Sequence, residues 1–239
     1  MSTSKRERLR RERIRQAQRE KRRRRLVVAS VGLVVVIAAV STVLFQMNRT
    51  TATSYAGALA PVTVQADGTV TMATAGTTKP VLDVYEDFQC PICKEFERIN
   101  GAQIKRFAAE GKIKVVYHPI AFVNPQGSLR AAAAAQCVPA VSWMAYHDEL
   151  FARQPDERVA LTVDDLKRFA AKAGVTDPAV LSCMASQSHA AQVRQRTQTA
   201  FSSPDFHGTP TLLLDGVKVD DDATLTSSGL RGVLEKATA

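Results

Sequence analysis

An apolar run stands near the start of the chain. Residues 26–45 (LVVASVGLVVVIAAVSTVLF) carry no charged side chain, and a helix of that length spans roughly 30 Å, the thickness of the hydrocarbon core of a bilayer. A buried helix of a globular domain would normally carry a polar face, and this run offers only Ser30, Ser41 and Thr42. The pattern predicts a transmembrane helix over 26–46.

After the apolar run the chain takes on the mixed spacing of a folded domain. Residues 47–60 are small and polar, which is typical of a linker. Apolar residues then alternate over 61–72 on both sides of Asp67-Gly68, and this pattern predicts a β-hairpin.

Two apolar strands, at 81–85 (VLDVY) and 113–118 (IKVVYH), flank a predicted helix at about 91–110. This strand–helix–strand order predicts a right-handed βαβ unit with parallel strands. The following segment has helical spacing almost throughout. Its helices are expected near 128–138, 140–152, 163–173, 177–186 and 188–202.

Strands return at the end of the chain. They are expected at 211–214 and 217–219, around an Asp215-Gly216 turn, and a final helix is expected over about 227–236. The order of elements predicts an α/β domain over 61–239 that contains an inserted block of helices.

The charge of the chain is concentrated at one end. The chain has 32 Lys and Arg and 23 Asp and Glu, a net charge of +9, but residues 1–25 alone hold 13 basic and 3 acidic side chains, a net of +10. The rest therefore holds 19 basic and 20 acidic side chains, a net of −1. By the positive-inside rule, the basic tail places the N-terminus in the cytoplasm and the folded domain outside.

Two other interpretations of this tail are less favourable. A cleaved signal peptide has a short basic region, an apolar stretch of about 7–15 residues and a small-residue cleavage site close behind it. Here the apolar run is longer, and Ala58-Leu59-Ala60 lies too far downstream, so we expect an uncleaved signal anchor. Binding of nucleic acid is not expected, because the tail has no interleaved aromatic residues.

Chemistry is indicated first by Cys90-Pro91-Ile92-Cys93, at the junction of a strand and a helix. The partial positive charge and free N–H groups of a helix N-terminus stabilise a thiolate, which is the reactive form of cysteine. Pro91 suits the first turn, and the spacing lets Cys93 close a disulfide with Cys90. The motif predicts thiol–disulfide exchange.

Two alternatives for this pair remain open at this point. A structural zinc site needs four ligands, and Cys137 and Cys183 do not form a second pair of this spacing. A purely structural Cys90–Cys93 disulfide would close so small a loop that it would constrain little chain entropy. Both alternatives are less favoured than a redox pair.

A second motif, Gly208-Thr209-Pro210-Thr211, leads into an apolar strand. Together with residues 85–93 (YEDFQCPIC), it resembles the DsbA-like thiol:disulfide oxidoreductases of bacteria over about residues 61–239. The resemblance implies a thioredoxin fold with a helical insertion at about 120–206. It also implies that Pro210 is cis and faces the redox pair, and that Thr209 contacts the substrate backbone and modulates Cys90. The 117 residues between Cys93 and Pro210 favour this branch over a plain thioredoxin.

The sequence departs from that family at two places. Ile92 stands where the strongly oxidising members carry a histidine. Val84 stands where relatives often have a buried acid, and alternation would point Asp83 to the other face of its strand. Glu86 and Asp87 are candidates to replace that acid, but we expect both to be solvated loop residues.

The resemblance also covers the two remaining cysteines. Some relatives carry a second, structural disulfide in the insertion, so a Cys137–Cys183 bond is expected, with two buried free thiols as the alternative. His118 and His147 are expected to be structural, and His207 lies near Pro210 in sequence. Trp143, Tyr146 and Phe151 are expected to form the core of the insertion.

These observations predict a bacterial cell-membrane protein with an extracytoplasmic thiol:disulfide oxidoreductase domain that introduces disulfides into exported proteins. No cofactor or metal is expected on the chain, and the resemblance implies reoxidation by a membrane quinone-linked oxidase of the DsbB or vitamin K epoxide reductase (VKOR) type. One alternative is the same fold acting as a membrane-tethered reductase or isomerase. Another is a non-catalytic module that binds copper or a partner protein.

Overall fold

The computed structural model describes residues 55–239. The predicted basic tail, the transmembrane helix at 26–46 and most of the linker lie outside the described residues. Within them, no helix is both long and apolar enough to cross a membrane.

A mixed sheet forms the centre of the described domain. Its strands lie in the order β1-β2-β4-β3-β5-β6. Their bounds are β1 Val62–Val64, β2 Val70–Met72, β3 Val81–Glu86, β4 Lys114–Pro119, β5 Thr211–Leu214 and β6 Val217–Lys218. The hairpin expected around Asp67-Gly68 is confirmed, because β1 and β2 pair antiparallel from Val62↔Met72 to Val64↔Val70.

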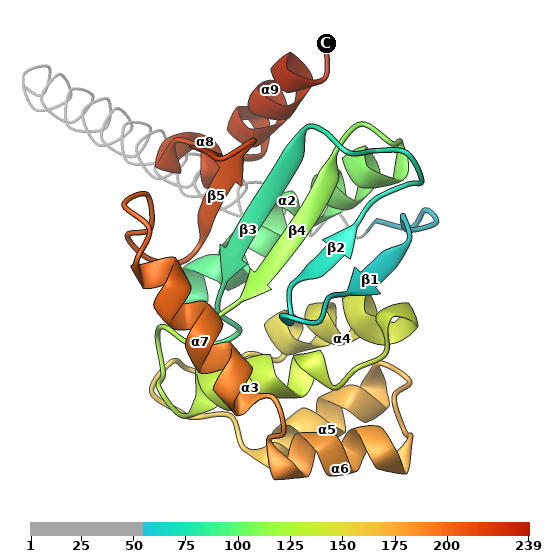
Figure 1. The fold of residues 1–239 in the computed structure, drawn as a ribbon, viewed down its shortest axis with the longest axis vertical. Helices are drawn as coiled ribbons and strands as arrows, with labels where there is room; N and C mark the ends of the chain where they lie inside the picture. The colour runs from blue at the N-terminus through green and yellow to red at the C-terminus, as the bar shows by residue number, and fades with distance from the viewer. Residues whose placement is uncertain (1–54) are drawn as a thin grey trace, which may run out of the picture. The chain divides into compact units, whose positions relative to one another are not determined.

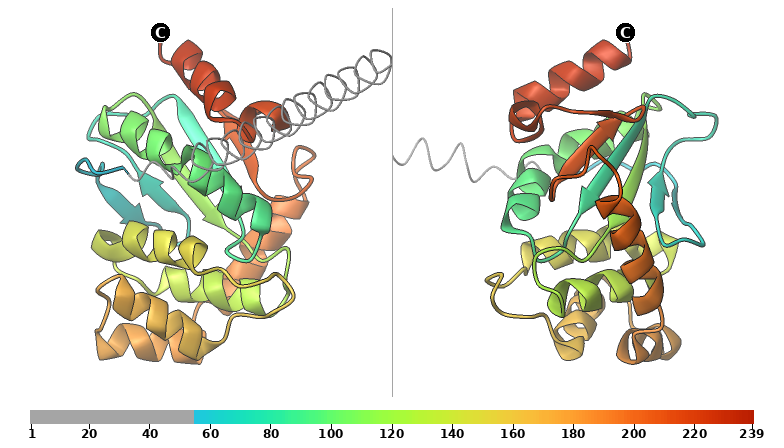
Figure 2. Two further views of the ribbon diagram at one scale, coloured as in Figure 1. Left: turned by 180° about the vertical axis from the view of Figure 1, so that it is seen from behind. Right: turned by 60° about the vertical axis from the view of Figure 1, so that its left-hand side comes forward.

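The predicted βαβ unit is also confirmed. β3 and β4 pair in parallel, with Val81 opposite Lys114 and Glu86 opposite Pro119. Helix α2 (Pro91–Ala109) connects them and stays continuous through Gly101. In Figure 1, α2 lies behind the sheet, and it comes to the front in the reverse view of Figure 2. The carboxyl ends of β3 and β4 therefore lie together at one edge of the unit.

The helical block follows β4 and returns to the sheet at β5. Its helices are α3 Gly127–Gln136, α4 Ala140–Ala152, α5 Val163–Lys172, α6 Pro178–Ser186 and α7 Ala190–Phe201. Helices α3 to α6 gather beyond the carboxyl ends of β3 and β4, as Figure 1 shows. After β6 come a short helix that the sequence did not predict, α8 (Asp221–Thr224), and α9 (Ser227–Ala237).

Local sequence explains the helix starts within this block. Thr162 and Asp165 form a reciprocal capping box at the start of α5, and the Asp177 side chain caps α6 ahead of Pro178. The aromatic residues expected in the core are buried, with Trp143 1%, Tyr146 0% and Phe151 4% exposed. These side chains fix α4 between the block and the sheet.

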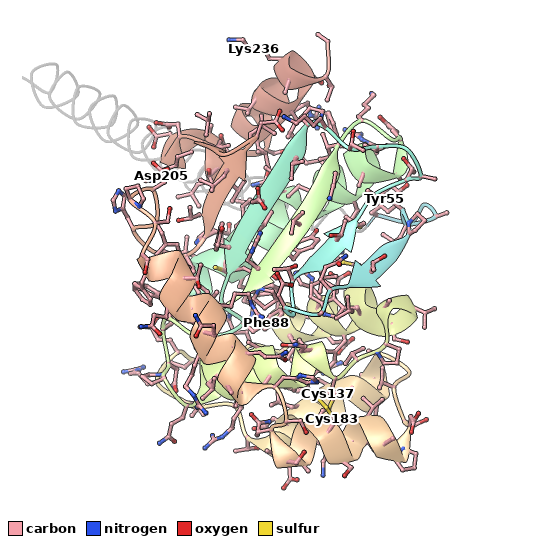
Figure 3. All side chains as sticks on the ribbon, in the orientation of Figure 1. Tyr55, Phe88, Cys137, Cys183, Asp205 and Lys236 are labelled. Atoms are coloured by element: carbon pink, nitrogen blue, oxygen red, sulfur yellow. A yellow bond between two sulfur atoms is a disulfide. The ribbon has the colours of Figure 1, made fainter. Side chains whose placement is uncertain are left out.

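A disulfide joins Cys137, at the end of α3, to Cys183 in α6, with an S–S distance of 2.07 Å. The bond is visible in yellow at the two labelled residues in Figure 3. It links residues 46 positions apart, so it restricts the unfolded chain considerably.

Replacing both cysteines, as Cys137→Ser with Cys183→Ser, should lower the free energy of unfolding by about 2–4 kcal/mol, because the unfolded chain regains the entropy of an open loop. Chemical denaturation of the variant and of the parent protein measures this difference. The matched control replaces Cys90 and Cys93 by serine instead and should cost much less. Equal stability of the parent and the Cys137/Cys183 variant would contradict the expectation.

Candidate active site

The redox pair lies at the junction between β3 and α2. Cys90 is the N-cap of α2, and Pro91 occupies the first turn of the helix. The Cys90 backbone is extended, and its N–H donates to the carbonyl oxygen of Asp87 at 2.9 Å. The turn therefore places the Cys90 sulfur at the N-terminus of α2, as the sequence predicts.

Cys90 is a free thiol whose sulfur has donors on several sides. The backbone N–H of Cys93 lies 3.3 Å from Cys90 Sγ. A hydrogen bond from the Cys93 side chain lowers the pKa of Cys90 to about 6, Thr209 and the N–H groups of Cys93 and Ile92 act in the same direction, and burial opposes them. Cys90 is therefore largely thiolate at neutral pH.

Cys93 has the opposite character. It is 0% exposed, and burial first, then its hydrogen bond to Cys90 and the charge of Cys90, raise the pKa of Cys93 well above its usual value. The negative charge of Glu86 adds to this rise. The two thiols thus divide into one reactive thiolate and one buried proton donor, which is the asymmetry that thiol–disulfide exchange requires.

The Gly208–Thr211 loop faces this pair. The Thr209–Pro210 peptide bond is cis, and the Thr209 carbonyl oxygen lies 3.3 Å from Cys90 Sγ. The structure thus brings four predicted site residues together from the two ends of the domain. The other two, Cys137 and Cys183, lie apart in the helical block.

A carboxylate organises the turn before Cys90. Asp87 Oδ1 accepts the N–H of Gln89 at 2.8 Å, and Oδ2 accepts those of Phe122 and Val123 at 2.7 Å each. The prediction that Asp87 is a solvated loop residue is wrong: it is 0% exposed, because three backbone donors replace water. Asp87 joins the active-site turn to the segment that leads into the helical block.

Two glutamines, which the sequence did not single out, connect the same turn to the block. The Gln154 side chain donates to the carbonyl oxygens of Phe88 and Cys90 at 3.0 Å each. In return, Gln89 donates to the Val159 carbonyl oxygen and accepts the Leu161 N–H, both at 2.9 Å. These hydrogen bonds therefore fix the backbone around Cys90 to the helical block.

Gly127 leaves room for this connection. A Cβ atom at this position would lie 1.5 Å from Gln89 Oε1 and 2.8 Å from the Leu161 nitrogen. Any side chain at residue 127 would displace Gln89. A glycine at the start of α3 is thus required by a contact with the active-site turn.

The prediction that Glu86 is a solvated loop residue is also wrong. It is 0% exposed rather than solvated, because the alternation along β3 points it inward with Leu82 and Val84. Its carboxylate lies 3.2–3.3 Å from His147 Nε2, so the buried charge has a partner on α4. Burial raises the pKa of Glu97, which also faces this histidine, to about 7.

The remaining candidates lie as their sequence positions suggest. Val84 is in the core, and Asp83 points to the opposite face, where it lies 2.8 Å from His118 Nε2. His207 lines a hollow of about 210 Å³ beside Ile92 and Pro210. The His207 side chain therefore lies beside the Pro210 loop and Ile92.

An apolar surface adjoins the same loop. Phe122, Phe201 and Phe206 pack against one another with ring centroids 5.3–6.1 Å apart, and Phe122 and Phe201 are 39% and 54% exposed. Phe122 approaches Gly208, so this surface continues to the Pro210 loop. Exposed aromatic surface of this kind suits a peptide or protein partner.

The pKa of Cys90 should depend on the donor at residue 93. Thiolate absorbance of the selectively reduced protein should titrate with a midpoint near pH 6, because the main stabilising bond comes from Cys93. Removing that donor in Cys93→Ala should raise the midpoint, and Cys93→Ser, which keeps a hydroxyl donor, should raise it less. A parent midpoint near the ordinary value of about 8.5 would refute the assignment.

Comparisons with known proteins agree with this geometry. The family model described as Thioredoxin matches residues 71–236. The structure is similar to the DsbG disulfide bond oxidoreductase of Mycobacterium tuberculosis, with 27% identity, TM-score 0.59, and 69% of this chain and 82% of the other covered. It is also similar to DsbA of the same organism in its reduced form, with 26% identity, TM-score 0.56, and 69% and 86% covered.

A third similar structure, BdbD of Bacillus subtilis, has 20% identity and TM-score 0.64, with 76% of this chain and 99% of the other covered, and it supports the fold alone. No curated protein matches the sequence. The family model spans most of the chain, and the enzymes similar in structure are thiol–disulfide oxidoreductases. The chain therefore belongs to the thioredoxin family and is a DsbA-like thiol–disulfide oxidoreductase.

Proposed function

We propose that the protein introduces disulfides into exported proteins through the Cys90–Cys93 pair. The observation that carries this proposal is the low pKa of Cys90, about 6, next to a buried Cys93 whose pKa is raised. Stabilising the thiolate stabilises the reduced form of the enzyme. A pair whose reduced form is stable accepts electrons readily, which favours oxidation of substrates.

The exchange begins when a substrate thiolate attacks Cys90 Sγ of the disulfide form. The Cys90–Cys93 bond breaks, a mixed disulfide forms between substrate and Cys90, and Cys93 leaves as a thiolate that takes up a proton. A second substrate thiolate then attacks the substrate sulfur of the mixed disulfide. Cys90 leaves as a stabilised thiolate, and two electrons have passed from the substrate to the enzyme.

Thr209 and Pro210 are proposed to hold the substrate during this exchange. The loop that carries them lies against Cys90 Sγ and borders the hollow that Ile92 and His207 also line. An extended peptide can pair with backbone groups at such an edge, as strand addition does elsewhere. The exposed phenylalanine surface of Phe122 and Phe201 would then receive apolar side chains of an unfolded substrate.

We further propose that residues 26–46 anchor the protein in the bacterial cell membrane, with the catalytic domain outside. The support is the +10 charge of residues 1–25 next to a charge-free apolar run of one bilayer thickness. The Cys137–Cys183 bond suits this location, because structural disulfides persist in oxidising compartments.

A membrane quinone-linked oxidase of the DsbB or VKOR type is the proposed electron acceptor that restores the disulfide form. A reductase or isomerase role for the same pair is the second candidate. Thiol trapping of Cys90 and Cys93 in intact cells distinguishes them, because an oxidase is held mostly as the disulfide and a reductase or isomerase mostly as thiols. Thiol–disulfide exchange by the parent protein would also distinguish either role from a non-catalytic module that binds copper or a partner protein.

Replacing the attacking sulfur tests the mechanism. Cys90→Ser should abolish the oxidative refolding of a reduced disulfide-containing protein, because a serine hydroxyl forms no mixed disulfide. Cys93→Ser is the matched variant: it keeps Cys90 and should accumulate a mixed disulfide with the substrate, visible by mass spectrometry. Full refolding activity of Cys90→Ser would refute the proposed mechanism.

The orientation in the membrane has its own test. An alkaline phosphatase fused after Ala239 should be active in the parent protein, because that enzyme requires export to fold. Replacing residues 21–25 (KRRRR) by neutral residues should lower this activity, since fewer positive charges retain the tail in the cytoplasm. An inactive fusion on the parent chain that is nevertheless stably produced would contradict the proposed topology.

A further inference from the structure

A cluster of ligand-type side chains lies behind the redox pair, and only the charge of Glu86 acts on that pair. Glu86 comes from the end of β3, Glu97 from α2 and His147 from α4. One ligand atom from each of these side chains lies within 4.8 Å of the other two. Glu86 and His147 are 0% exposed. Three elements thus direct potential metal ligands to one buried point.

Three oxygen atoms in this region are buried without a hydrogen bond, although one of them, Glu86 Oε1, lies 3.2 Å from His147 Nε2. They are Glu86 Oε1, Glu97 Oε1 and the Tyr117 hydroxyl, none of which has a hydrogen-bond partner among the described residues. Tyr117 is itself 0% exposed, and its ring centroid lies 5.2 Å from that of His147. Buried polar atoms are rarely left unpaired in native proteins, so these oxygens have capacity for a further electropositive partner beside His147.

His147 is oriented as metal-binding histidines are. Its Nδ1 lies 3.0 Å from Asp148 Oδ1, and Lys105 Nζ holds both Asp148 oxygens at 2.6 Å. A carboxylate on Nδ1 fixes the tautomer and directs Nε2 to the opposite side. Here that side is Glu86, at 3.2–3.3 Å from Nε2.

Acidic side chains outnumber basic ones in the cluster. Glu86, Glu97 and Asp148 bring three negative charges, and Lys105 brings one positive charge. Burial lowers the pKa of His147, but the charge of Glu86 and the hydrogen bonds to Asp148 and Glu86 outweigh it and raise this pKa to about 10. A bound divalent ion would take the place of the His147 proton and supply one more positive charge. Aromatic rings of Phe88, Trp143 and Phe151 surround the imidazole, with centroids 5.0–5.8 Å away, so water does little to screen the excess.

The helix beside the cluster leaves space for the Glu97 side chain. A Cβ atom at Gly101, one turn later in α2, would lie 2.6 Å from Glu97 Oε2. The glycine interrupts an otherwise good helical sequence, and its missing side chain accommodates this carboxylate. Glu97 as a residue is half-buried, whereas its Oε1 is buried.

We propose that Glu86, Glu97 and His147 bind a divalent transition-metal ion, with Zn²⁺ as the best match. Zinc takes imidazole nitrogen and carboxylate oxygen together, often with three protein ligands and a fourth position for water. Calcium and magnesium take oxygen ligands, so the histidine disfavours them. The ion would tie β3, α2 and α4 together directly behind Cys93.

Calorimetric titration of the full-length protein with ZnCl₂ tests the proposal. The protein is first stripped with a chelator and kept in the Cys90–Cys93 disulfide form, so that the redox thiols cannot bind zinc. One ion should bind per chain. Glu86→Gln and Glu97→Gln should each weaken binding by at least about tenfold, and Asp148→Asn by about 10–100-fold through loss of its hold on His147. Glu235→Gln, an exposed carboxylate on α9, is the matched control and should bind as the parent does.

A second measurement needs no variant. Zinc should raise the unfolding temperature of the parent protein, because an ion that binds the folded state stabilises it, while Ca²⁺ at the same concentration should not. Absence of zinc binding by the parent overturns the proposal and leaves protons to balance the cluster. Binding that Glu86→Gln and Glu97→Gln leave unchanged overturns the assigned ligands, and equal effects of Ca²⁺ and Zn²⁺ overturn the choice of metal.

Discussion

The hydrogen bonds that the Cys90 sulfur accepts at the start of α2 are the interaction on which the rest of the site depends. A helix N-terminus offers N–H groups and partial positive charge, and here Cys90 itself takes the capping position with Cys93 N–H at 3.3 Å. The capping bond and the reactivity therefore have one cause. The contacts that begin α2 at Cys90 therefore also stabilise the Cys90 thiolate.

The helical block helps to hold the chain in place at the start of α2, and it also covers one end of the sheet. Gln154 binds the carbonyl oxygens on both sides of the turn, and Gln89 binds the block in return. Asp87 adds backbone bonds to Phe122 and Val123. Since the buried side of the turn is held by the insertion and its open side by Thr209, Cys90 is placed between two segments far apart in the sequence.

The sequence was most informative where chemistry is local. The β3–α2–β4 unit follows from apolar periodicity, and the position of Cys90 follows from a strand that leads directly into Pro91. The Asp67-Gly68 hairpin and the caps at Thr162 and Asp177 follow from turn and capping preferences. The pairing of Cys137 with Cys183 and the conformation of Pro210 rested on family resemblance, because spacing alone specifies neither.

What the sequence could not predict depends on tertiary contacts. Glu86 and Asp87 look like loop acids, and their burial requires His147 and the Phe122 backbone, which come from other elements. Gln154 lies 64 residues after Cys90, and nothing in its local sequence indicates that its amide binds the active-site turn. The predicted transmembrane helix lies outside the described residues and stays a prediction.

The reduction potential of the Cys90–Cys93 pair, measured by equilibration with glutathione, tests the central claim most directly. Because the stabilised Cys90 thiolate favours the reduced form, the potential should be clearly less negative than the value of about −270 mV for thioredoxin. A potential at or below about −270 mV would contradict the account, because a pair so stable as a disulfide would not serve as an oxidant.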